Sequence, residues 1–188
     1  MATGLDSFKE VLAEYRSLAL WAGVSSVSIP FFAAFAGVAP PWPNRIALMT
    51  AVFQLIGLIL SFQLYYSAKR RVVTKAIIVM TLASCILLLL YIFLFSIFAV
   101  SVGGAQKYII VGYECTTKAA ATYGKECQGI GYEELRAAQF NEFVIWTRMS
   151  IAVVRTALTS IWLAFFLSLS SVIALFLVFQ RSRVVKPT

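Results

Sequence analysis

"AIIVMTLASCILLLLYIFLFSIFAV" (residues 76–100) contains no charged side chain over its whole length. A helix needs about 20 predominantly apolar residues to cross the hydrocarbon core of a bilayer. Strands of a membrane barrel would instead alternate apolar and polar residues over about 10 positions. Because lipid offers the backbone no hydrogen bonds, a spanning stretch of this kind must satisfy its own. We therefore expect this stretch to be a transmembrane helix.

Three further apolar stretches are long enough to span, at about residues 18–38, 46–66 and 160–179. The composition agrees, because 61% of the residues are hydrophobic and only 13% are charged, against about 25% charged in globular domains. A cleaved signal peptide is the alternative for the first stretch. Asp6, Glu10 and Glu14 precede it, whereas a signal peptide begins with basic residues, so we expect a true span. The sequence predicts an all-α integral membrane protein, a four-helix transmembrane bundle forming a single domain over residues 1–188. Residues 101–159 are expected to form a long second outer loop with a helical extension.

Basic residues in short loops mark the cytoplasmic side of a membrane protein. They gather in the connection between the second and third spans and in the C-terminal tail: Lys69, Arg70, Arg71 and Lys75, then Arg181, Arg183 and Lys186. The opposite short loop has only Arg45. We therefore expect cytoplasmic N- and C-termini in a multi-pass protein of the plasma (inner) membrane. The net charge of +8 is then a topology signal, and no direct nucleic-acid partner is expected.

The polar segment between the third and fourth spans contains Cys115 and Cys127. On the outer side of a membrane such thiols form lasting disulfides. Closing a loop of this length contributes on the order of 3 kcal/mol. We expect a Cys115–Cys127 disulfide, the alternative being two free thiols in an unstructured loop. Cys85, among leucines of the third span, is expected to be a buried and inert packing residue.

No Pro or Gly interrupts residues 132–186, so the last helical pattern is longer than a bilayer needs. Arg148 and Arg155, two turns apart, share one face of that helix. They are candidates for binding lipid headgroups, for a ring around an outer vestibule of a homo-oligomer, or for a buried pair with Glu133, Glu134 or a neighbouring subunit. Glu142 is a poor partner on a continuous helix, because six or thirteen positions rotate it away from that face.

The chemistry of an enzyme is missing. The chain has no histidine, the commonest general base and metal ligand. Its glutamates all lie outside the expected spans, and no C-x-x-C or phosphate-binding glycine loop occurs. We expect no enzymatic activity, no metal and no cofactor.

Three functions remain open, all with the lipid bilayer as the surrounding partner. The first is a homo-oligomer that responds to membrane disturbance or forms a pore, favoured by small residues at four-residue spacing such as Gly57/Ser61 and Ala164/Ser168. Gln54 and Gln63 are assigned to one broad face of the second span, as bundle contacts or pore lining. The second is an anchor whose basic inner face, Lys69 to Lys75 and the tail from Arg181, binds a cytoplasmic effector protein. The third is a small transporter, although the chain shows no internal repeat.

The layout also resembles a known family. Four spans in about 190 residues, both ends inside, a cysteine-bearing second outer loop and a short basic tail are similar to the membrane subunit of the Kiwa anti-phage defence system. The resemblance implies a membrane sensor that oligomerises and recruits a cytoplasmic effector during phage attack. Claudins and tetraspanins share the outline, but the first outer loop here is short and no C-C-G signature surrounds Cys115 or Cys127.

Overall fold

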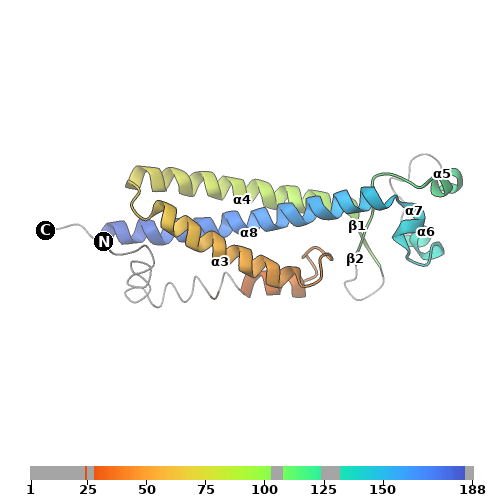
Figure 1. Ribbon diagram of the computed structural model, residues 1–188, viewed down its shortest axis with the longest axis horizontal. Coiled ribbons are helices and arrows are strands. Elements are labelled where there is room, and N and C mark those ends of the chain that lie inside the picture. The colour runs from red at the N-terminus through yellow and green to blue at the C-terminus, as the bar shows by residue number, and fades with distance from the viewer. Residues whose placement is uncertain (1–23, 25–27, 103–107, 124–131, 185–188) are drawn as a thin grey trace.

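The computed structural model describes Val24 and residues 28–102, 108–123 and 132–184, with Tyr123, Glu134 and residues 181–184 described by their backbone alone. The chain is mostly helical, at 76%. In the described part, three helices are long and apolar enough to cross a membrane (Figure 1): α3 (Ile46–Tyr65), α4 (Arg70–Phe98) and α8 (Arg148–Val184).

Helix α8 is the central element of this bundle. It packs lengthwise against both α3 and α4, which meet each other only marginally. Ile46 and Leu158 share one core cluster and Phe62 and Val178 another, so α3 and α8 run in the same direction. Val73, at the start of α4, joins the cluster of Val178, so α4 runs the opposite way. Burial agrees with the central position of α8. In the apolar 18-residue window of each helix, 44% is buried in α8 but only 11% in α4.

Small side chains let the helices approach closely. A Cβ on Gly57 would come within 2.5 Å of Leu167 Cδ1 and 2.8 Å of Ser170 Oγ on α8. Ser61 Oγ donates to Ser171 Oγ at 2.8 Å. The spacing of Gly57 and Ser61 therefore marks a close contact between two helices of one chain, and does not by itself support the homo-oligomer that it was taken to favour.

A second serine pair joins α4 to α8. Ser84 Oγ and Ser168 Oγ are 2.7 Å apart, and Ser168 Oγ also donates to the carbonyl of Phe165 at 2.8 Å. A hydroxyl has one proton to donate, so Ser84 is the donor of the interhelical bond.

The second span agrees with its prediction to within a residue, but the third begins earlier than expected. Helix α4 starts at Arg70 instead of Ala76, so Arg70, Arg71 and Lys75 lie on the helix and not in a connecting loop. Arginine and lysine are good helix formers and no breaker separates them from the apolar run. Of the first expected span, the structure describes Val24 and a helical segment at 28–35, and the rest lies outside the described residues. The first of the four expected spans therefore stays a prediction.

At one end of the bundle lies a small folded unit, the cap, made of the described residues between 99 and 147. Strand β1 (Ala99–Ser101) pairs antiparallel with β2 (Tyr108–Ile110), and three short helices follow (Figure 1): α5 (Thr117–Tyr123), α6 (Tyr132–Ala137) and α7 (Glu142–Ile145). The two strands were not foreseen, although Val100, Ile109 and Ile110 are strand-forming residues. Leu135, Ile145 and Trp146 are buried in a core cluster that the cap shares with the start of α8.

Two side-chain expectations in the spans are wrong. Cys85 is a free thiol exposed on the surface of α4 rather than buried, because the neighbouring Ser84 takes the position facing α8. Gln54 is 0% exposed whereas Gln63 is exposed. Nine residues turn a helix by about two and a half turns, so these two glutamines point to opposite sides and not to one face.

Candidate functional site

The expected continuous helix over residues 132–186 is interrupted before α8. Helix α7 ends at Ile145, and Trp146 has an extended backbone. Thr147 then caps the start of α8, accepting at Oγ1 from the backbone N–H of Ser150 at 3.3 Å. Asn141 caps α7 in the same manner, accepting at Oδ1 from the N–H of Phe143 at 3.2 Å. These two caps are the sequence signals of the break, which a search for Pro and Gly alone misses.

The break is held in place by an extended segment that lies beside it. Cys115 forms an antiparallel bridge with Trp146. The N–H of Thr116 donates to the carbonyl of Ile145, and the N–H of Thr147 donates to the carbonyl of Glu114, both at 2.9 Å. The backbone groups that a continuous helix would have used are therefore satisfied from across the cap.

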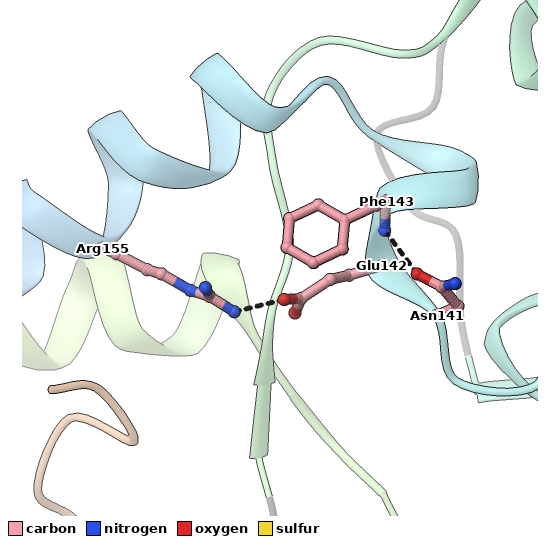
Figure 2. Close-up of polar contacts among 4 residues, drawn as sticks. All are labelled: Asn141, Glu142, Phe143 and Arg155. Carbon is pink, nitrogen blue, oxygen red and sulfur yellow. Dashed lines mark hydrogen bonds and ion pairs between the residues drawn. The ribbon is translucent and has the colours of Figure 1, made fainter. Parts of the chain in front are cut away.

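The two predicted arginines converge on α7. Arg155 Nη2 donates to Glu142 Oε1 in the salt bridge drawn in Figure 2. The guanidinium of Arg148 lies over the ring of Phe143, with Cζ 5.6 Å from the ring centroid. Two arginines two turns apart on α8 thus bind consecutive residues of α7. We call these four residues the arginine clamp.

Glu142 was set aside as a partner for Arg155, and that inference is wrong. It assumed one helix through both residues. Because the chain turns between α7 and α8, Glu142 faces Arg155 across the bend instead of lying on the opposite side of the same helix. The structure also brings Phe143 to Arg148, a contact the sequence analysis missed.

The salt bridge is partly withdrawn from solvent. The side chains of Arg155 and Glu142 are 24% and 15% exposed. Arg155 Nε is buried and has no hydrogen-bond partner among the described residues. A partly buried cation that loses its carboxylate is left with an uncompensated charge, which costs more than the net contribution of the intact pair. The clamp therefore fixes the cap to α8 through a salt bridge, and removing one of its two partners destabilises the protein.

Beneath the clamp, two hydrogen bonds tie the connection from the 28–35 helix to α3 to the bundle, and a third joins α8 to α3. Tyr91 OH donates to the carbonyl of Val38 at 2.6 Å, and Thr159 Oγ1 donates to the carbonyl of Trp42 at 3.1 Å. On α8, Trp162 Nε1 donates to Thr50 Oγ1 of α3 at 3.0 Å. These bonds fix the end of the bundle on which the cap is mounted.

The predicted basic residues meet at the other end, which we call the basic end. The side chains of Lys69, Arg71 and Lys75 are exposed, and the guanidinium of Arg70 lies over the ring of Phe179 at 4.7 Å. That contact joins the start of α4 to the last turns of α8, where Arg181 and Arg183 are described by backbone alone. The two clusters, far apart in sequence, are neighbours in space.

The Cys115–Cys127 disulfide stays a prediction, because Cys127 lies outside the described residues. Cys115 lies beside the break and forms an isolated β-bridge with Trp146.

Within the described residues, no group of three or more His, Cys, Asp or Glu side chains could hold a metal ion. No protein-family model, curated protein or solved structure matches the chain.

Proposed function

We propose that this chain is a non-enzymatic, homo-oligomeric membrane protein that responds to membrane disturbance and couples to a cytoplasmic partner. The observation that carries the proposal is the continuity of α8. Its 37 residues span about 55 Å at 1.5 Å per residue, against a hydrocarbon core of about 30 Å. The helix begins at the arginine clamp and ends at the basic end, so displacement of the cap is transmitted along a rigid element.

In this proposal the basic end is cytoplasmic, which follows from the distribution of lysine and arginine. The cap then lies outside, where a Cys115–Cys127 disulfide would hold it together. The surface offered to a cytoplasmic partner is cationic, and its residues are Lys69, Arg70, Arg71, Lys75, Arg181 and Arg183. A soluble partner with an acidic face fits that surface.

Coupling is tested by hydrogen exchange on the reconstituted full chain. We expect transfer from long-chain to short-chain phosphatidylcholine bilayers to change exchange both in the cap and in the last turns of α8, because thinning strains a helix anchored at both ends. In Glu142→Gln the change should remain in the cap alone, while Glu133→Gln, an exposed carboxylate of α6 outside the clamp, should behave as wild type. If the change in hydrogen exchange at the basic end were equal in Glu142→Gln and Glu133→Gln, coupling through the clamp would be contradicted.

The oligomer is tested by the mass of the detergent-solubilised particle. We expect several chains per particle, and a monomer would remove the oligomeric part of the proposal.

Because the layout resembles the Kiwa membrane subunit, we further propose that phage infection is the disturbance to which the protein responds. Expression of the chain with its neighbouring genes should then lower plaque formation, and Glu142→Gln should abolish the protection without lowering the amount of protein.

A pore is the second candidate, and Gln54 favours it. This side chain is fully buried between membrane-length helices, and neither its amide oxygen nor its amide nitrogen has a hydrogen-bond partner among the described residues. Such a group is stabilised when water reaches it. Ion flux from liposomes containing the chain, lowered in Gln54→Leu but not in Gln63→Leu, would establish the pore, and liposomes that stay tight would exclude it.

A further inference from the structure

One stripe of exposed side chains runs along the face of α4. Its members recur at helical spacing of three or four residues, and each is exposed: Arg71, Lys75, Ile78, Leu82, Ile86, Leu89 and Phe93. Residues at this spacing share one side of a helix. The stripe is therefore cationic for its first turn and purely apolar afterwards.

The two cations of the stripe have no carboxylate to pair with inside the described chain. The first turn of α4 holds no acidic residue, and no Asp or Glu occurs anywhere between residues 15 and 113. The neighbouring cation Arg70, which could also bind an anion, lies over the ring of Phe179. Arg71 and Lys75 are thus available to an anion from outside the chain.

The dimensions of the stripe fit one lipid molecule. From Lys75 to Ile86 the helix rises by about 16 Å, roughly half of a 30 Å hydrocarbon core. A phosphate that contacts Arg71 and Lys75 would place its acyl chains along Ile78, Leu82 and Ile86. A soluble protein could reach the cations but not the aliphatic side chains below them, which lie at the depth of the acyl chains.

We propose that this stripe is a binding surface for an anionic phospholipid of the leaflet at the basic end. The headgroup phosphate contacts Arg71 and Lys75, and the acyl chains lie along the aliphatic part of α4. The proposal rests on the membrane placement of α4 that the proposed function also uses, and is independent of the oligomer. It assigns Arg71 and Lys75 to the lipid instead of to the cytoplasmic partner, and leaves Lys69 and the basic tail to that partner.

The test measures lipid selectivity of the reconstituted full chain by electron paramagnetic resonance. Spin-labelled phosphatidylglycerol and spin-labelled phosphatidylcholine are compared by the fraction that is motionally restricted at the protein surface. We expect phosphatidylglycerol to associate about 25-fold more strongly at low ionic strength, since each of the two basic residues contributes about fivefold near an anionic surface. Added salt should lower this preference through screening.

The decisive variant is Arg71→Gln/Lys75→Gln, and the matched control is Lys118→Gln/Arg136→Gln, which removes two exposed cations of the cap. The first should abolish the preference for phosphatidylglycerol and the second should retain it. A wild-type protein that restricts both lipids equally and independently of salt would overturn the proposal even if the variant failed to fold. Unchanged selectivity in the variant would also overturn it, and loss of a protein partner from that variant would assign the two cations to the partner. A restricted fraction of either lipid would still show that the protein has a surface inside the membrane, so failure here is distinguishable from failure of the proposed function.

Discussion

Arg155 donates a hydrogen bond to Glu142, a residue thirteen positions earlier in the chain, although on one helix these positions would point away from each other. The contact exists because α7 and α8 are separate helices joined by the extended Trp146 and the capping Thr147. A carboxylate at a helix start and an arginine two turns into the next helix thereby fix the angle between cap and bundle.

Replacing Glu142 by alanine should destabilise the protein by about 2 kcal/mol, below the 3–5 kcal/mol of a fully buried pair because both side chains are partly exposed. Adding Arg155→Met should recover part of that loss, since the orphaned charge is removed. Thermal unfolding in detergent measures both. A double variant that loses the sum of the two single losses would show that the residues are not coupled.

Ser84→Ala should cost about 0.6–1 kcal/mol, the usual size of an interhelical hydrogen bond in a membrane. Ser96→Ala on the same helix is the control, because Ser96 is exposed and donates only to the carbonyl of Phe93 in its own helix. Unfolding of the purified protein by titrated detergent compares the two. Equal effects would mean that the bond between Ser84 and Ser168 contributes nothing specific.

Gly112→Ala should damage the protein more than Gly57→Ala. A Cβ at position 112 would overlap Ser150 Oγ and come within 2.9 Å of Trp146 Cβ, an atom fixed to the backbone at the helix break. At position 57 it meets the side-chain ends of Leu167 and Ser170, which can rotate. Overpacking of the first kind typically costs 1–3 kcal/mol, and protease resistance of the cap should fall only in Gly112→Ala.

The proposed orientation, with the basic end in the cytoplasm, predicts which lysines are reachable from outside. A membrane-impermeant amine reagent on intact cells should label Lys118 in the cap and leave Lys69 and Lys75 unlabelled until the cells are opened. Mass spectrometry of the digested protein locates the label. Reaction of Lys69 or Lys75 from outside would reverse the topology and place the cap in the cytoplasm.

Thiol counting tests the predicted disulfide. In the unfolded, unreduced protein, alkylation should modify Cys85 alone, and reduction should expose two further thiols. Cys115→Ser should then leave Cys127 reactive without reduction. Three reactive thiols before reduction would contradict the Cys115–Cys127 pairing.

Hydrophobic pattern located the membrane-length helices well, because length and apolar composition are local properties of the chain. Helix α3 begins at Ile46 as expected. The same reasoning placed the start of α4 too late, since a positive charge marks a membrane boundary but does not end a helix. It also joined α7 to α8, because the break at Trp146 depends on pairing with Cys115, which lies far away in sequence.

The candidate site was predictable in its residues but not in its geometry. Arg148 and Arg155 stood out as cations on an apolar pattern. Their partners Glu142 and Phe143 were not recognisable, because the face of a residue can be computed only when the helix that carries it is known. Caps at Asn141 and Thr147 would have indicated the two helix starts.

The central position of α8 has a consequence for the order of synthesis. Helices α3 and α4 leave the ribosome first, and in the finished fold they have little contact with each other. Until the last helix is inserted, Ser61 and Ser84 lack the acceptors that Ser171 and Ser168 later provide. Assembly of this bundle is therefore completed from its C-terminal part, and a chain terminated before residue 148 would lack the helix against which both α3 and α4 pack.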